Sequence, residues 1–119
     1  MIYRAASTIP GSEDYREALK QPFVRGHHLL MLKAHAEAPD FTLSAMALSA
    51  AAGSADHRYA NLHYGQLAHR IAEFLDIQPA TYDEGKKRLW TTAIAEGWRE
   101  VKNGIWYWRL YPEVATALI

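Results

Sequence analysis

The chain has 119 residues, no net formal charge at pH 7 and no cysteine, and half of its residues are hydrophobic. This length fits one domain whose core needs no disulfide or metal. The lack of cysteine excludes thiol catalysis, a disulfide framework and cysteine-based zinc sites, and neutrality argues against a protein held on nucleic acid by bulk charge. Because no window approaches the roughly 20 apolar residues that cross a bilayer and no apolar run of signal length follows the N-terminus, we expect a cytoplasmic protein without a membrane partner.

The first third of the chain predicts a lead-in and two helices. Residues 1–11 form the lead-in, which ends at the turn signal Pro10-Gly11. Ser12 is a good N-cap for a short helix that ends near Lys20, with acidic residues in its first turn. Pro22 suits the first position of a second helix, whose apolar residues recur at helical spacing until Pro39 limits it.

The middle of the chain predicts a pair of helices joined by a short turn. One runs from Thr42 to a C-cap at Gly53. The next has Ser54 as its candidate N-cap, ends near Asp76, and carries a six-residue apolar face: Ala60, Tyr64, Leu67, Ile71, Phe74 and Leu75. Two helices around a short glycine-containing turn have the outline of a helix-turn-helix.

The last third is rich in residues that favour strands. Asn103-Gly104 predicts a two-residue type I′ turn between the arms Trp98–Lys102 and Ile105–Leu110. Leu89–Ile94 is either a third strand or a short helix, and Pro112 opens a final helix over residues 113–118.

Together these elements predict an α+β, mainly α fold. Helices followed by a twisted hairpin are the order of a winged-helix-like helix-turn-helix domain with a C-terminal β-hairpin. We expect one such domain over 1–119, with the helical part at 12–76 and the wing and short C-terminal helix at 86–119.

Basic residues are concentrated in the predicted wing. Residues 85–110 carry a charge of +4, from six bases and two acids: Lys86, Lys87, Arg88, Arg99, Lys102 and Arg109 against Glu96 and Glu100. In a neutral protein such a segment suits phosphate contacts. It is equally typical of a solvated hairpin with a mild excess of base.

The helix over residues 55–76 is the candidate reader of DNA bases. Its predicted outer face contains Arg58, Gly65, Gln66 and His69, with Asn61 at the boundary. Arginine pairs with guanine edges, and asparagine or glutamine with adenine edges, while a glycine on this face permits close backbone approach. Any solvated helix also carries such residues, so the assignment depends on the turn before it and the basic hairpin after it.

Nothing in the chain indicates catalysis, a metal or a cofactor. None of the six histidines forms the i, i+4 pair with a glutamate base that hydrolytic zinc uses. No serine has a nucleophile-elbow setting, and no phosphate-binding glycine motif is present. The carboxylates of Asp83 and Glu84 fall in a predicted loop.

Aromatic residues crowd the predicted hairpin and suggest a second reading. Strand alternation places Trp106 and Trp108 on one face and Ile105, Tyr107 and Arg109 on the other. One face belongs to the core, and the other is either covered by the chain itself or free to bind a partner. A protein partner or a homodimer is therefore the alternative to DNA.

The segments LLMLKAHAEAPDFTLSAMALSAAAG and ANLHYGQLAHRIAEFL, with WYWRLYPEVATAL near the C-terminus, carry a family resemblance. They resemble a module found beside HNH nuclease domains of McrA-like bacterial restriction endonucleases. The residues concerned are Leu30, His35, Pro39, Thr42, Leu43, Leu48, Gly53, Asn61, Tyr64, Gly65, Leu67 and Ile71. The resemblance implies DNA recognition without cleavage, because the HNH constellation is missing from this chain.

We therefore predict a non-catalytic, double-stranded-DNA-binding protein of a bacterial regulatory or restriction and defence system. The reader helix enters the major groove with Arg58, Asn61 and Gln66 on base edges, and the basic hairpin contacts phosphates. The alternative is a protein-interaction module or inhibitor, for example a phage- or plasmid-encoded antagonist of a defence system, that acts through the aromatic hairpin.

Overall fold

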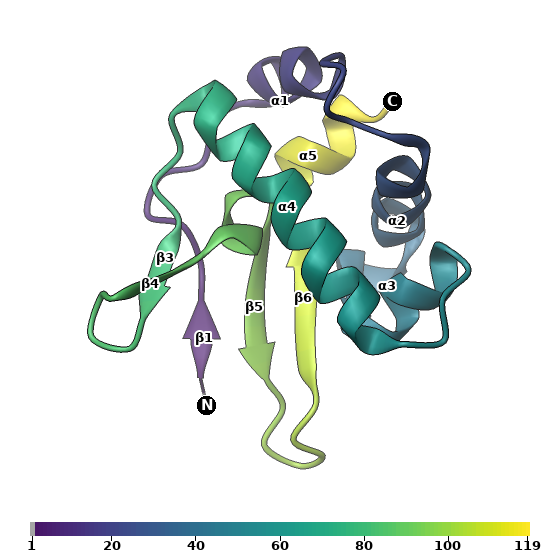
Figure 1. The fold of residues 1–119 in the computed structure, drawn as a ribbon, viewed down its shortest axis with the longest axis vertical. Helices are drawn as coiled ribbons and strands as arrows, with labels where there is room; N and C mark the ends of the chain where they lie inside the picture. Colours follow the sequence, from purple (N-terminus) through teal and green to yellow (C-terminus); the bar gives the residue numbers. More distant parts are fainter. Residues whose placement is uncertain (1) are drawn as a thin grey trace.

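The computed structural model describes residues 2–119 and has an α+β fold in which helices predominate (Figure 1). Helix α4 (His57–Leu75) crosses in front of an antiparallel sheet, and the shorter helices gather beside it and at one end of the sheet. No helix within residues 2–119 has both the length and the apolar character that a membrane crossing requires. The other elements are β1 (Tyr3–Arg4), α1 (Ser12–Leu19), α2 (Gly26–Glu37), a 3₁₀ turn (Pro39–Phe41), β2 (Thr42–Ser44), α3 (Ala45–Ala51), β3 (Ala80–Tyr82), β4 (Lys87–Leu89), the 3₁₀ helix η2 (Trp90–Ala93), β5 (Ala95–Arg99), β6 (Trp106–Leu110) and α5 (Pro112–Ala117).

The main sheet has the order β1-β5-β6-β2, and all of its neighbouring strands are antiparallel. The prediction that Thr42 begins a helix was wrong, because residues 42–44 form β2 and pair with β6. Asp40 and Phe41 both have positive φ, so the chain turns sharply there and leaves extended. Helix α3 then begins at Ala45, and the Ser44 hydroxyl caps it by accepting the Ala47 N–H at 3.2 Å.

Two other helix starts also differ from the prediction. Helix α2 begins at Gly26 instead of Pro22, because the backbone first makes a turn and the Arg25 N–H then donates to Nδ1 of His28 at 2.9 Å. Helix α4 begins at His57, where the carboxylate of Asp56 caps it. The C-cap prediction at Gly53 is confirmed, since this residue follows α3 with a φ of +86°.

The apolar face of α4 forms the centre of the core. Four of its six predicted members, Ala60, Tyr64, Leu67 and Ile71, are buried. Phe74 lies at the edge, half exposed, with its ring 6.4 Å from that of Phe23. Small residues on the adjoining face of α4 let η2 pack closely against the helix.

The segment of the chain that connects α4 to β5 contains a hairpin that the sequence analysis did not anticipate. Strands β3 and β4 pair from Ala80↔Leu89 to Tyr82↔Lys87. The residues at the turn, Asp83, Glu84 and Gly85, all have positive φ. The ambiguous segment 89–94 ends β4 and then forms η2, so it is a short helix for most of its length.

The β5–β6 hairpin is present, but its turn is longer than predicted. Its strands cover 95–99 and 106–110, and residues 100–105 form the loop. Glu100 and Ile105 close this loop through a backbone hydrogen bond of 2.8 Å. Of Asn103 and Gly104, only the glycine has positive φ, which excludes the type I′ turn.

His35 connects three elements in the core. Its Nε2–H donates to the backbone carbonyl of Trp108 at 2.8 Å, and its Nδ1 accepts from the hydroxyl of Tyr64 at 2.8 Å. Because a carbonyl oxygen only accepts, Nε2 carries the proton of the neutral imidazole, and Nδ1 is the acceptor. Helix α2 is thereby joined to α4 and to β6 by buried hydrogen bonds.

Gly97 in β5 makes room for two tryptophan rings. A Cβ at this position would lie 2.5–2.7 Å from atoms of Trp106 and Trp108. The two rings stand on the same face of β6, 5.6 Å apart and edge to face, as strand alternation predicts. Both indoles can rest on the sheet only because the facing strand has no side chain there.

We expect Gly97→Ala to lower the free energy of unfolding by about 1–3 kcal/mol, the usual cost of overpacking a close-packed site. Urea denaturation followed by circular dichroism measures this change. Gly26→Ala is the matched control, because nothing lies within 4 Å of a Cβ at that position. Equal stability of the two variants would contradict the packing role of Gly97.

We also expect stability to fall as the pH drops below 6.5. Burial lowers the pKa of His35 from 6.5 to about 4, so the unfolded chain binds this proton more readily than the folded one. The stabilisation is complete above pH 6.5 and is lost as the pH approaches 4, with about 2 kcal/mol lost between pH 7 and pH 5. Urea denaturation at the two pH values tests this, and an NMR titration in which the His35 imidazole protonates near pH 6.5 would refute it.

Candidate functional site

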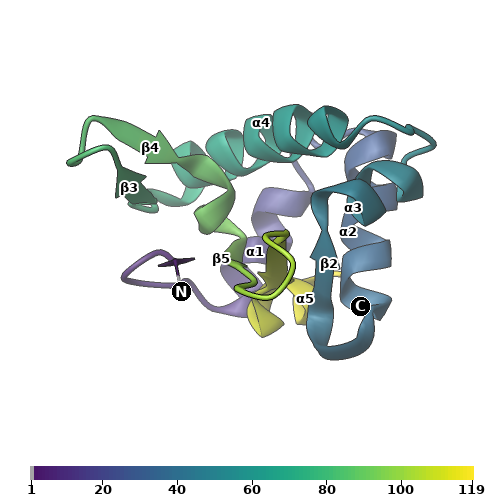
Figure 2. The same cartoon turned by 90° about the horizontal axis from the view of Figure 1, so that it is seen from below.

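One face of the molecule collects some of the residues that the sequence singled out. Figure 2 views this face directly: α4, the β3–β4 hairpin, the 100–105 loop and β2 surround its centre. We call it the cavity face, because a cavity of about 830 Å³ opens there.

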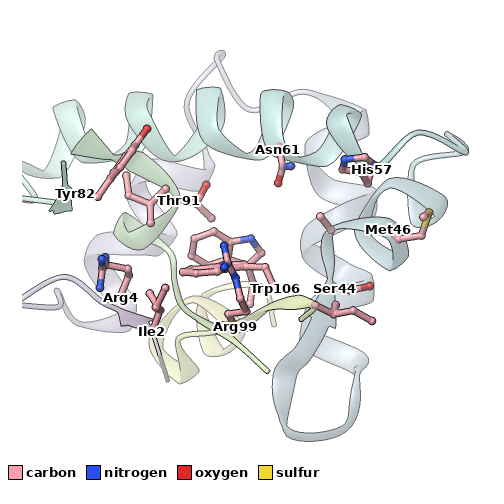
Figure 3. A pocket seen from close by; sticks show the side chains of 14 residues that line it. Ile2, Arg4, Ser44, Met46, His57, Asn61, Tyr82, Thr91, Arg99 and Trp106 are labelled. Atoms are coloured by element: carbon pink, nitrogen blue, oxygen red, sulfur yellow. The ribbon is translucent and has the colours of Figure 1, made fainter. Parts of the chain in front are cut away.

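The cavity is lined mainly by apolar and aromatic side chains from distant parts of the chain (Figure 3). Its floor is the tryptophan pair of β6, one wall is the first half of α4, and the opposite ends are the β3–β4 hairpin and the start of α3. The lining residues are Ile2, Arg4, Ser44, Ala45, Met46, His57, Asn61, Tyr82, Leu89, Thr91, Arg99, Ile105, Trp106 and Trp108.

The polar side chains of this lining include no aspartate or glutamate. Asn61 points from α4 into the cavity, and Arg99 lies beside Trp106 (Figure 3). The titratable side chains of the lining are Arg4, His57, Tyr82 and Arg99. The Nε1 of Trp106 is buried without a hydrogen-bond partner among residues 2–119, which costs about 1–3 kcal/mol if nothing else supplies one.

The structure brings several predicted DNA-binding residues to this face. Asn61 and Arg99 both line the cavity. Lys87 pairs across the hairpin with Tyr82 and so shares its face. Lys102 is exposed in the 100–105 loop.

Arg58 lies near this face, at the beginning of α4, but its guanidinium is already engaged. Its Nε and Nη2 donate to the carboxylate of Asp56 at 2.7–3.1 Å. These hydrogen bonds lower the pKa of Asp56 to about 2. Arg58 must leave this carboxylate before it can pair with a guanine.

Other predicted reader residues lie elsewhere. Gly65 faces η2, where a Cβ would be 3.8 Å from the Thr91 hydroxyl, an ordinary van der Waals distance, so this glycine lies against the protein itself. Gln66 is exposed, but it is turned about 140° around the helix from Asn61. His69 stacks on Trp90 at 3.8 Å.

The basic hairpins are only moderately positive. The β3–β4 turn places Asp83 and Glu84 beside the predicted phosphate contacts Lys86, Lys87 and Arg88, and Arg88 lies 5.7 Å from the ring centre of Trp90. Glu100 similarly accompanies Lys102 in the longer loop. Within residues 2–119, none of Lys86, Lys87, Arg88, Arg99 and Lys102 forms an ion pair.

Several lining residues were missed by sequence reasoning. Ile2 and Arg4 were assigned to the lead-in without a strand, although their alternation with Tyr3 is the pattern of a strand with two different faces. Tyr82 and Leu89 lie on a hairpin that has no strong turn signal. The tryptophan pair was the one part of the lining that the alternation along β6 predicted.

A second cluster of polar rings lies between α2 and α4. The ring centres of His27 and His63 are 5.0 Å apart, and His28 and Tyr59 adjoin them. Burial and the neighbouring cations lower the pKa of His27 and bring that of His28 to about 4. In the described part of the chain, no three histidine, aspartate or glutamate side chains are arranged to hold a metal ion.

On the opposite face of the β5–β6 hairpin, the charged side chains interact with one another and with the aromatic rings. Arg109 donates to Glu96, forms an ion pair of 3.2 Å with Asp40 and lies 5.4 Å from the ring centre of Trp98. Tyr3 also donates to Glu96. The aromatic residues on this side are therefore partly covered by the chain's own charged groups.

No protein-family model matches the chain, and no curated protein or solved structure is significantly similar to it.

Proposed function

We propose that this protein is a non-catalytic, double-stranded-DNA-binding domain of the winged-helix type, which uses the cavity face. The observation that carries the proposal is that the first half of α4, the 100–105 loop and the β3–β4 hairpin all contribute residues to the lining of one cavity. Figure 2 shows how these three segments are arranged. Helix-turn-helix proteins read the major groove with the N-terminal residues of their second helix.

The connectivity supports this proposal. The order α2, β2, α3, α4, β5, β6, with β2 paired to β6 and β5 joined to β6 by a loop, corresponds to the helix and strand order of winged-helix domains. In this scheme α3 and α4 are the helix-turn-helix and residues 100–105 are the wing. The β3–β4 hairpin is then an addition between the reader helix and the wing strands.

The charge distribution supports modest phosphate contact. Five bases on the two hairpins have no ion-pair partner among residues 2–119: Lys86, Lys87, Arg88, Arg99 and Lys102. If all five contact phosphates, the logarithm of affinity falls with the logarithm of salt concentration at a slope of roughly −4.5.

We expect binding to random-sequence duplex DNA to weaken by up to roughly 500-fold between about 50 and about 200 mM salt. Fluorescence anisotropy measures this change. Lys102→Ala should make the slope shallower by about 0.9 and weaken binding to all sequences alike. Lys33→Ala, which removes an exposed cation from α2, is the control and should leave the slope unchanged.

No binding at the lower salt concentration would overturn the DNA proposal. It would favour the alternative of a protein-interaction module, which co-purification of a defined partner or a dimer in analytical ultracentrifugation then tests.

Base reading by α4 predicts a difference between two amides on one helix. Once a preferred site has been selected, Asn61→Ala should reduce the preference for that site by about 1–3 kcal/mol, or roughly 5- to 150-fold. Gln66→Ala should leave it unchanged, because Gln66 lies outside the cavity face. Competition binding between the selected and scrambled duplexes measures both, and an unchanged preference in the Asn61 variant would refute the reader assignment.

A further inference from the structure

The cavity itself has a composition that a duplex surface does not require. A basic, polar groove is sufficient to hold phosphates and base edges, yet this cavity is built mostly from apolar and aromatic side chains. We infer that it is a binding site for a planar aromatic ring that carries an anionic group. The site is argued from the cavity alone, and only its use for a nucleotide of DNA rests on the proposed function.

The lining provides surfaces for a flat ring. Trp106 lies in the middle of the lining, and Tyr82 comes from the β3–β4 hairpin (Figure 3). Trp108 and Leu89 line the same cavity. Aromatic rings stack favourably on such surfaces. The volume of about 830 Å³ lies within the usual range for small-molecule sites.

The charges of the lining favour an anion. Arg4 and Arg99 line the cavity, and no aspartate or glutamate does, although the whole chain is neutral. Arg99 has no ion-pair partner among residues 2–119, and Arg4 uses only Nη1, which donates to the Tyr3 carbonyl at 3.0 Å. Guanidinium groups bind carboxylate and phosphate with two parallel hydrogen bonds.

Asn61 favours a ring that has its own donors and acceptors. Its side chain is exposed to the cavity and makes no hydrogen bond with residues 2–119. An amide offers one acceptor and two donors, which match the edge of a nitrogen heterocycle such as a nucleobase. The ligand chemistry is therefore a heteroaromatic ring with a phosphate or carboxylate.

Such a group reaches the cavity from one of two sources. One is a free nucleotide or aromatic acid in solution. The other is a nucleotide of bound DNA that has left the base stack, which is least costly when the base is unpaired. The same side chains serve either source.

The test uses deoxyadenosine monophosphate, deoxyadenosine and benzoate as probes of the whole protein, followed by NMR of the tryptophan indole and asparagine amide signals. We expect saturable shifts at Trp106 and Asn61, and at least tenfold tighter binding of the monophosphate than of deoxyadenosine, because a charge-assisted hydrogen bond to the phosphate is worth at least about that factor. Arg99→Ala should remove this tenfold advantage, while Lys33→Ala should preserve it. Lack of saturable shifts with all three probes would overturn the inference.

A second measurement identifies the source. Anisotropy compares a fully paired duplex with one that contains a single unpaired adenine. If the duplex with the unpaired adenine binds more tightly and Asn61→Ala abolishes this difference, the cavity takes a nucleotide of DNA. If both duplexes bind equally and the monophosphate still binds, the cavity takes a free ligand. If the monophosphate binds and neither duplex does, the inferred ring-anion site is supported and the DNA proposal fails. If a duplex binds and no ring probe shifts the signals, the DNA proposal is supported and the ring-anion site fails.

Discussion

The cavity face depends on the position of β6, and the hydrogen bonds of His35 fix that position relative to the helices. β6 pairs with β5 on one side and β2 on the other, so it is a central strand that joins β2 to the rest of the sheet. The bond from His35 to the Trp108 carbonyl joins this strand to α2, and the bond from Tyr64 to His35 adds α4. One neutral imidazole thus joins α2, α4 and β6, and it sets the distance between α4 and the sheet.

Gly97 provides the space in which the tryptophan rings of the cavity floor pack. A Cβ at this position would lie 2.5–2.7 Å from atoms of Trp106 and Trp108, so the two rings could not keep their present places over β5. With glycine there, the rings form a low floor beneath Asn61. The hollow beside the helix is thus a consequence of strand packing, and the β3–β4 hairpin contributes Tyr82 and Leu89 to its lining.

Local signals in the sequence predicted the elements well and their boundaries less well. The periodic face of α4, the glycine C-cap of α3 and the alternation along β6 were correct, because each depends on neighbouring residues alone. The missed strand at Thr42–Ser44 owes its conformation to pairing with β6, more than 60 residues later in the chain, and no local propensity reports such a partner. The same reason explains the site. Asn61 and Arg99 were predicted one at a time, whereas the cavity that brings them together with Ile2 and Tyr82 exists only after the sheet has formed. The helical wheel likewise placed Gly65 outside, because it could not include η2.

The neutrality of the chain bears on how such a surface would select its target. Proteins that neutralise many phosphates bind every sequence tightly and gain specificity as a small difference between large affinities. Each hairpin of this protein mixes acids with its bases, and Arg58 is held by Asp56, so the electrostatic contribution is limited to a few exposed cations. If the cavity face binds DNA as proposed, short-range contacts at Asn61 and in the aromatic cavity would make up a larger share of the total binding energy. Such a balance would favour discrimination between sequences over affinity.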